Sequence, residues 1–322
     1  MSGEESSGPL ASLSIDLDDR WSYLKVRGSP EWESLPTFLP TLIPRALGFL
    51  AEHSLRITFF VVGQDAALER NRSLLRAVAD AGHEVANHSF HHDSWLHLYS
   101  EARLRREIEM AEEAIEKATG HRPRGFRGPG FSTTCACRRL LASRGYVYDA
   151  SPCANILGPL ARLYYLHNVP LTEQQREERK RLNASLRAAL GRNRASIRAV
   201  DGTSLVEVPV TTMPFFRLPI HLSYLQALAA RSEAAAAAYF QLAQTLCRIT
   251  GNTLSLLLHP TDFLGSDDEC GLPFFPAMGL PSARKLAFVH RVVRMVASAA
   301  RIVPVLDHAM AVRKASAPLA PA

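Results

Sequence analysis

Three carboxylates stand together near the N-terminus, in and just after the short apolar stretch Leu13–Leu17. Asp16 and Asp18 are two residues apart, so an extended backbone would place both on one face, and Asp19 follows directly. Two carboxylates that lie close raise each other's pKa unless a cation sits between them. Taken alone, this cluster is better explained as a solvated acidic turn, and it gains meaning only beside other ligands.

A histidine cluster supplies such ligands. His88 and His92 are four residues apart, so one helical turn would bring the two imidazoles side by side. Imidazoles at this spacing are common metal ligands, although His91 competes with them and could instead lie at the rim. Two imidazoles and one carboxylate leave coordination positions open, which is typical of a catalytic rather than a structural metal. The remaining aspartate could then act as a general base.

Two further segments could complete such a site. Arg127 could orient a carboxylate through a two-pronged contact, and Gly130 lets the backbone approach a substrate oxygen. His259 ends the apolar run Leu256–Leu258 and could donate a proton to a leaving amine. The alternatives are a plain Gly/Pro turn at 125–132 and an edge histidine with its own hydrogen-bond partners.

These residues follow candidate strands in a chain that alternates apolar runs with helical patterns. Such alternation predicts an α/β fold with a parallel sheet or a β/α barrel, in which the chemistry lies where the strands end. The predicted strands are Leu13–Leu17, Arg56–Val62, His83–Asn87, Gly125–Phe126, Tyr146–Tyr148, Ser204–Val210, Thr253–Leu258 and Ile302–Val305. The predicted helices are Thr37–His53, Ala66–Ala81, Glu101–Ala118, Ala136–Ser143, Ser232–Ile249 and Ser282–Ala300.

The segment 155–200 breaks this rhythm and reads as two helices. It carries nine Lys or Arg and three Glu, which equals the net charge of +6 of the whole chain. A basic surplus is usually a solvated face, but it could also contact anionic lipid head groups or an acidic glycan. We expect no nucleic-acid partner, because the basic residues are not interleaved with stacking aromatics in a recognisable binding module.

The chain shows no basic start followed by an apolar run, no stretch of eighteen apolar residues, and no disulfide framework among its five cysteines. We therefore expect a cytoplasmic location. The expected organisation is a tail at 1–11, one domain at 12–312 with a helical insertion at about 155–200, and a flexible tail at 313–322.

In this order, the motifs resemble those of the polysaccharide deacetylase family, which is carbohydrate esterase family 4 with the NodB-homology domain. The segment His88–His92 matches the metal motif of that family and is the most specific element. The buried run Ile57–Gly63 looks like the second strand of the family, and Tyr148–Ser151 looks like a segment common in one subset. The resemblance covers residues 12–151 well and residues 203–310 loosely.

The resemblance implies a distorted (β/α) barrel with about seven parallel strands, plus the helical insertion. It also implies a divalent metal, usually Zn²⁺, with Co²⁺, Ni²⁺ or Mn²⁺ as alternatives. The site residues that it implies are Asp16 as base, Asp18, His88 and His92 as metal ligands, Arg127 to orient the base, and His259 as acid. The spacing of the aspartate pair favours Asp18 as ligand, but Asp19 is not excluded.

The chain departs from the family pattern in three places. Most members have two adjacent aspartates followed by glycine, whereas the pattern here is Asp-Leu-Asp-Asp-Arg-Trp. The aromatic residue that often follows the Arg-x-Pro segment is replaced by Gly130. The segment 155–200 has no counterpart in the minimal family domain.

Loops after late strands should share the active-site face of such a barrel. The loops Met213–Pro219 and Leu272–Pro276 each offer paired Phe in a Pro-stiffened frame, and could rim the site or form a small satellite core. Leu157–Leu166 could lie at a membrane interface, which would make the protein peripheral at the inner membrane face. The expected substrate-binding residues are Gly130, Phe131, Tyr148, Phe215 and Phe274.

We therefore expect a metal-dependent hydrolase that removes an N-acetyl group from an amino sugar of a polysaccharide, an exopolysaccharide or a lipid-linked glycan precursor. One alternative is a deformylase or another amide or imide hydrolase that acts on a small or lipid-linked amino sugar. A second alternative is a non-catalytic glycan-binding barrel, against which the retention of Asp16, Arg127 and His259 argues.

Overall fold

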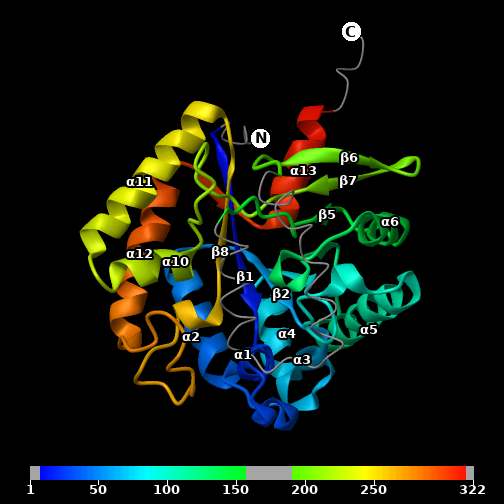
Figure 1. Cartoon of the computed structure of the whole chain (residues 1–322), viewed down its shortest axis with the longest axis horizontal. Coiled ribbons are helices and arrows are strands. Elements are labelled where there is room, and N and C mark those ends of the chain that lie inside the picture. Colours follow the sequence, from blue (N-terminus) through cyan, green and yellow to red (C-terminus); the bar gives the residue numbers. More distant parts are fainter. Residues whose placement is uncertain (1–7, 157–190, 317–322) are drawn as a thin grey trace, which may run out of the picture.

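A curled, mostly parallel sheet forms the centre of the computed structural model, which describes residues 8–156 and 191–316 (Figure 1). The strand order is β6-β7-β5-β4-β3-β2-β1-β8, and β9 pairs with β1 outside this path. Only β6 is antiparallel to its neighbour. The strands are β1 (Leu10–Leu17), β2 (Thr58–Val61), β3 (Glu84–Asn87), β4 (Gly125–Phe126), β5 (Tyr148–Asp149), β6 (Ser196–Val200), β7 (Thr203–Glu207), β8 (Leu254–Leu258) and β9 (Arg301–Val303).

Strand β1 lies inside the sheet, next to its last strand β8, and its residues are covered on both faces. All of them except the first are buried, and small Ser12 and Ser14 alternate with Leu13 and Ile15. The strand pairs with β2 on one side and with β8 on the other, while its first residues pair with β9. The carboxylates at the end of β1 therefore lie between β2 and β8, at the edge of the sheet where the parallel strands end.

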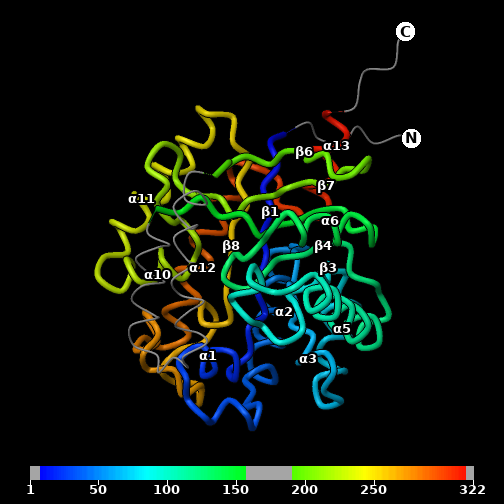
Figure 2. Tube along the Cα trace, turned by 45° about the vertical axis from the view of Figure 1, so that its right-hand side comes forward, coloured from blue at the N-terminus to red at the C-terminus, as the bar shows by residue number. Residues whose placement is uncertain are grey.

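Helices pack around this curled sheet (Figures 1 and 2). Helices α10 to α12 pack on the side of β8, whereas α5 and α6 lie on the side of β3 to β7. Their ends follow ordinary capping chemistry: the Ser100 side chain accepts the N–H of Arg103 in the first turn of α5, and left-handed Gly120 ends the helix. The helices are α1 (Arg20–Arg27), α2 (Leu39–Glu52), α3 (Gly63–Ala67), α4 (Arg72–Asp80), α5 (Glu101–Thr119), α6 (Cys135–Ser143), α10 (Leu222–Ala229), α11 (Glu233–Thr250), α12 (Ser282–Ala297) and α13 (Val305–Ser316).

The expected fold class, a distorted (β/α) barrel, is confirmed. The described residues form nine strands rather than about seven, of which eight run parallel and β6 lies antiparallel at one edge. The single helix expected at Ala66–Ala81 is wrong. Leu68 is extended, so the chain breaks into α3, a 3₁₀ turn at Glu69–Asn71, and α4.

The expected domain boundaries also need correction. β1 begins at Leu10 and α13 runs to Ser316, so both expected tails reach into regular elements that are stabilised by packing. Residues 157–190 lie outside the described part of the chain. They include most of the insertion expected at 155–200 and all of the expected membrane-interface segment Leu157–Leu166. The end of that insertion is strand β6 rather than helix, since it pairs with β7 along its whole length.

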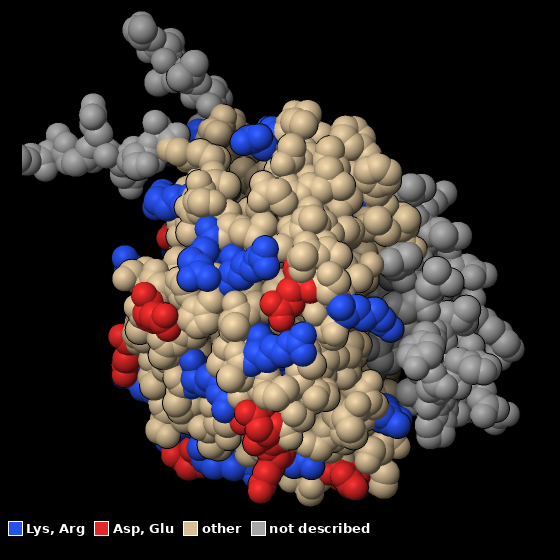
Figure 3. Space-filling view, turned by 90° about the vertical axis from the view of Figure 1, so that its left-hand side faces the viewer, with Lys and Arg blue, Asp and Glu red and all other residues tan. Residues whose placement is uncertain are grey.

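The surface on the side of α11 and α12 carries basic and acidic side chains interspersed on a largely uncharged background (Figure 3). Among the described residues, no helix is both long enough and apolar enough to span a bilayer.

Candidate active site

Parallel strands bring the expected site residues to one edge of the sheet. In the β1–β8 pair, Ile15 lies opposite Leu258, so Asp16 and His259 follow at the same level. In the β3–β4 pair, Asn87 lies opposite Phe126, so His88 and Arg127 likewise follow at one level. The carboxyl ends of parallel strands are where such folds carry their chemistry.

Asp18, His88 and His92 form a compact, largely buried cluster. The Oδ1 atom of Asp18 lies 2.9 Å from Nε2 of His92 and 3.3 Å from Nε2 of His88. One ligand atom from each residue lies within 4.8 Å of the others. His88 and His92 are 2% and 7% exposed, so the three ligand atoms converge away from bulk water.

The chemistry of these donors fits a divalent metal. Nδ1 of His88 lies 2.6 Å from the carbonyl oxygen of Arg127, to which it donates, so the lone pair of His88 is on Nε2 and faces Asp18. Asp18 Oδ1 is buried, and no described residue donates a well-oriented hydrogen bond to it. Such opposed lone pairs need a cation between them.

The electrostatics of the cluster also favour positive charge. Burial alone would raise the pKa of Asp18, but the two neighbouring imidazoles outweigh it and hold this pKa well below its usual range. Burial would lower the pKa of His88, but the charges of Asp16 and Asp18 raise it overall. Both directions describe a site that stabilises a cation.

The histidine pair does not sit on a helical turn, which corrects the expectation from its spacing. His88–His92 is an irregular loop in which Ser89 and His92 have positive φ values of 63° and 54°. The loop is held from α5, because the buried carboxylate of Glu107 accepts the backbone N–H groups of Phe90 and His91, at 3.0 and 2.6 Å. These buried hydrogen bonds to Glu107 offset the conformational free energy that the left-handed backbone of Ser89 and His92 costs.

Asp19 takes a structural position instead of joining the cluster. It caps α1, and its Oδ1 accepts the N–H groups of Arg20 and Phe38 at 2.7 and 2.9 Å. Burial raises the pKa of Asp19 to about 6. The geometry thus favours Asp18 over Asp19 as the carboxylate ligand.

Asp16 is paired with a fully buried arginine. Nη1 of Arg127 donates to Asp16 Oδ1 at 2.5 Å and to Ser14 Oγ at 2.8 Å, and its Nε donates to the carbonyl oxygen of Ala150 at 3.1 Å. The guanidinium also lies over the ring of Phe60, with Cζ 4.1 Å from the ring centroid. Asp16 Oδ2 remains 3.9 Å from Nε2 of His88, beside the metal cluster.

His259 is oriented by two contacts from neighbouring elements. Its Nδ1 lies 3.0 Å from Oγ of Ser223, at the start of α10. Its backbone N–H donates to Asp262 Oδ2 at 2.7 Å, in the 3₁₀ turn Pro260–Asp262 that follows β8. A protonated imidazole carries hydrogen on both nitrogens, so Nδ1–H of His259 can donate to the Ser223 hydroxyl while Nε2–H stays available to a leaving group.

The expected substrate-binding residues divide into three groups. Gly130 is exposed and has a φ of 58°, and neighbouring Phe131 is half-buried, so both lie at the accessible rim of the Arg127 turn. Phe215 is 73% exposed and Phe274 is 38% exposed, each on a separate loop. Tyr148 is fully buried, and its hydroxyl donates to Glu84, so it is a core residue rather than a wall of the site.

Several residues that support the cluster were not predicted from the sequence. Trp21 packs edge-to-face on His92, with ring centroids 6.5 Å apart, and its indole N–H donates to Asp65 at 2.8 Å. Glu107 and Ser223 act from helices far along the chain. The one available signal was Asp19 followed by an amphipathic run, which is a helix start that places Trp21 beside the histidines.

Comparison with known proteins agrees with this geometry. Residues 29–148 match the family model described as Polysaccharide deacetylase. The chain is 27% identical over 155 residues to a peptidoglycan deacetylase of Helicobacter pylori, covering 47% of this chain and 52% of that protein. It is 38% identical over 101 residues to a chitooligosaccharide deacetylase of Rhizobium leguminosarum bv. trifolii, covering 31% and 42%. The alignments thus span about half or less of these relatives.

The fold comparison extends over nearly the whole chain. A candidate polysaccharide deacetylase from Mycobacterium smegmatis aligns with a TM-score of 0.63 and 20% identity, covering 99% of this chain and 97% of that one. At this identity, the likeness bears on the fold alone. Residues 29–148 thus match the model of the polysaccharide deacetylase family, and the relatives and the fold agree with that match.

Proposed function

We propose that this chain is a metal-dependent carbohydrate N-deacetylase that removes an acetyl group from an N-acetylated amino sugar. The observation that carries the proposal is the convergence of Asp18 Oδ1 and the two histidine Nε2 atoms beside a carboxylate fixed by Arg127. The names of the relatives, which are peptidoglycan and chitooligosaccharide deacetylases, support an amino-sugar substrate.

Asp18, His88 and His92 would hold the metal, for which nitrogen and oxygen donors of this kind favour Zn²⁺. When bound, the ion lowers the pKa of a water molecule and polarises the amide carbonyl. Asp16 accepts the proton of the attacking water, and Arg127 keeps its carboxylate aimed at the cluster. His259 donates a proton to the nitrogen of the leaving amine.

The test is product release from candidate amino sugars, with and without a chelator. Purified protein loaded with zinc should release acetate from N-acetylglucosamine oligomers, and Asp16→Asn should abolish the release while retaining the metal. Release of formate instead of acetate would favour a deformylase. A wild type with neither metal nor turnover, whose Asp16→Asn variant behaves in the same way, would favour a glycan-binding barrel.

A lipid-linked glycan precursor, processed in the cytoplasm, is the second candidate substrate. Phe215 and Phe216 are 73% and 55% exposed, which is unusual for adjacent aromatic residues. The backbone N–H of Ile156, which is 44% exposed, donates to the carbonyl oxygen of Arg217 in the same loop. These apolar groups suit a lipid surface. Sedimentation with anionic liposomes tests this, and a Phe215→Ser, Phe216→Ser variant that sediments like wild type would exclude it.

A further inference from the structure

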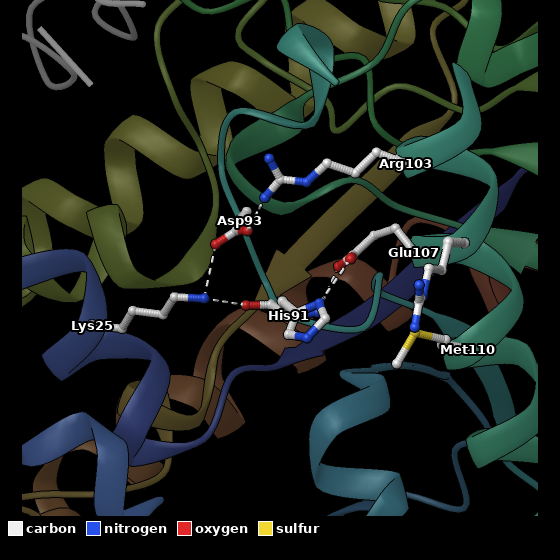
Figure 4. Close-up of a pocket in the computed structure, with 7 residues that line it drawn as sticks. Lys25, His91, Asp93, Arg103, Glu107 and Met110 are labelled. Atoms are coloured by element: carbon white, nitrogen blue, oxygen red, sulfur yellow. Dashed lines mark hydrogen bonds and ion pairs between the residues drawn. The ribbon is translucent and has the colours of Figure 1, made fainter. Parts of the chain in front are cut away.

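A pocket of about 240 Å³ opens beside the proposed metal cluster, between α1, the end of the histidine loop and the first half of α5 (Figure 4). None of the catalytic roles proposed above uses its side chains. The residues that line it are Lys25, His91, Asp93, Arg103, Arg106, Glu107 and Met110.

The two carboxylates of the pocket are already engaged by the protein. Asp93 is 7% exposed, its Oδ1 lies 2.8 Å from Nζ of Lys25, and its Oδ2 accepts the hydroxyl of Tyr99. Glu107 is 4% exposed, and accepts two backbone N–H groups and the ring Nδ1 of His91 at 2.9 Å. Little acceptor capacity is left for a ligand.

The three cations of the pocket retain unused donors. Arg103 lies over the ring of Tyr99, donates to its hydroxyl at 2.9 Å, and reaches Asp93 only at 3.8 Å. Arg106 is exposed, and no hydrogen bond or ion pair to a described residue satisfies its guanidinium. Three cations against two occupied carboxylates leave a surplus of positive charge and of N–H donors, which suits an acidic oxygen ligand.

The pocket shares a wall with the metal cluster. His91 and Asp93 flank His92 in the chain, and Lys25 Nζ donates to the carbonyl oxygen of His91 at 2.7 Å. Lys25 Nζ also lies 5.7 Å from the ring centroid of Trp21, which packs edge-to-face on His92. The same short loop therefore contributes to both the cluster and the pocket.

We propose that this pocket binds an anionic substituent, a carboxylate or a phosphate, on the glycan whose amide the protein cleaves. The identity of the ligand as a glycan rests on the proposed function, whereas anion binding by the pocket does not. The protein thus selects acidic N-acetylated glycans over neutral ones, with Arg106 as the contact that the ligand completes.

The experiment compares two arginines of the same helix. Arg106→Gln removes a lining residue, whereas Arg105→Gln removes an equal charge from an exposed neighbour that pairs with Glu109 at 3.6 Å and does not line the pocket. Binding to the zinc-loaded full chain is measured by calorimetry for three oligomers of equal length. These are a neutral N-acetylglucosamine oligomer, one that alternates glucuronic acid with N-acetylglucosamine, and one that carries phosphate; inorganic phosphate is a separate arm.

We expect at least one acidic oligomer to bind wild type about three- to tenfold more tightly than the neutral oligomer, with the preference weakened by salt. Arg106→Gln should erase the preference, and Arg105→Gln should retain it. The acid that binds more tightly identifies the substituent.

Equal binding of neutral and acidic oligomers by wild type would overturn the proposal. An equal loss of the acidic preference in both variants would also overturn it, because it would indicate only the general electrostatic field of the helix. Inorganic phosphate that binds as tightly as the acidic oligomers would overturn the glycan part. Arg106-dependent binding without turnover on any oligomer would refute the proposed function and leave the pocket standing. Turnover that Arg106→Gln leaves unchanged on every oligomer would support the proposed function and refute the role of the pocket.

Discussion

Adjacent aspartates perform different tasks at the residue scale. Asp18 faces two imidazoles, whereas the buried carboxylate of Asp19 accepts two backbone N–H groups. The difference follows from direction alone, since the chain leaves β1 at Asp18 and enters α1 at Arg20. A ligand and a helix cap therefore occupy consecutive positions.

Substituting the two aspartates separates these tasks. Asp18→Asn should lower zinc affinity more than about 100-fold, because the charged ligand is lost. Asp19→Asn should keep the metal and change the free energy of unfolding by less than about 1 kcal/mol, because asparagine also caps helices. Metal analysis after dialysis and urea unfolding measure both effects. Metal loss in the Asp19 variant alone would reverse the assignment.

At the scale of elements, two helices hold the reactive loops from outside. Glu107 of α5 binds the backbone of the histidine loop, and Ser223 of α10 binds the ring of His259. Neither helix carries a proposed ligand or catalytic group itself. Their contribution is to fix direction, which can be measured separately from chemistry.

Glu107→Ala should weaken zinc binding by about 10- to 100-fold, because the histidine loop loses its acceptor and relaxes from its left-handed geometry. The matched control is Glu113→Ala on the exposed side of the same helix, which should bind zinc as wild type does. Competition with a chromophoric chelator gives the affinity. If both variants bind zinc equally well, the loop holds its shape without α5.

Ser223→Ala should lower kcat by roughly tenfold and leave KM nearly unchanged, because the ring of His259 loses the hydroxyl that orients it at Nδ1. Ser223→Thr retains the hydroxyl and should restore most of the activity. Steady-state kinetics on one N-acetylated oligomer distinguish the two parameters. A parallel rise in KM would mean that Ser223 binds substrate instead.

At the scale of the whole molecule, the two ends of the sheet have opposite tasks. The metal cluster lies at the carboxyl ends of the strands, whereas a buried polar network closes the amino ends. There, His308 of α13 lies 2.9 Å from Ser12 Oγ and 2.8 Å from Thr253 Oγ1, and Thr58 and Glu84 accept the first N–H groups of the same helix. In barrels of this kind, that face serves stability.

This network predicts acid sensitivity. Burial lowers the pKa of His308 to about 4, from an ordinary value of 6.5. Between these values, the unfolded chain binds a proton that the folded chain does not, so stability is present above pH 6.5 and falls as the pH drops towards 4. The loss from His308 at pH 5 should be about 2 kcal/mol. Urea unfolding at pH 7 and pH 5 measures it.

His308→Gln is the matched variant, since glutamine keeps polar atoms but does not titrate. It should be less stable than wild type at pH 7, and its stability should fall less steeply between pH 7 and pH 5. Unchanged steepness would show that other groups govern the acid response. His83 and His221, whose pKa values burial also lowers, to about 4 and about 3, are those groups.

The fold class and the residue types of the candidate site could be predicted from the sequence. Periodicity identifies strands and helices because each element buries one pattern of side chains, and the run His88–His92 is local enough to be read directly. Parallel strands end at the same edge of a sheet, so residues that follow strands are expected to meet there.

Which aspartate faces the histidines depends on where α1 begins, and this could be seen only in the folded structure. The folded structure also decided the irregular shape of the histidine loop, since Glu107 reaches it from a helix that the sequence places elsewhere. Tyr148 turned out to serve the core, because its hydroxyl meets Glu84. The pocket of Lys25, Arg103 and Arg106 exists only once α1 and α5 pack on the same loop. Contacts between distant segments follow from three-dimensional packing, which no local pattern records.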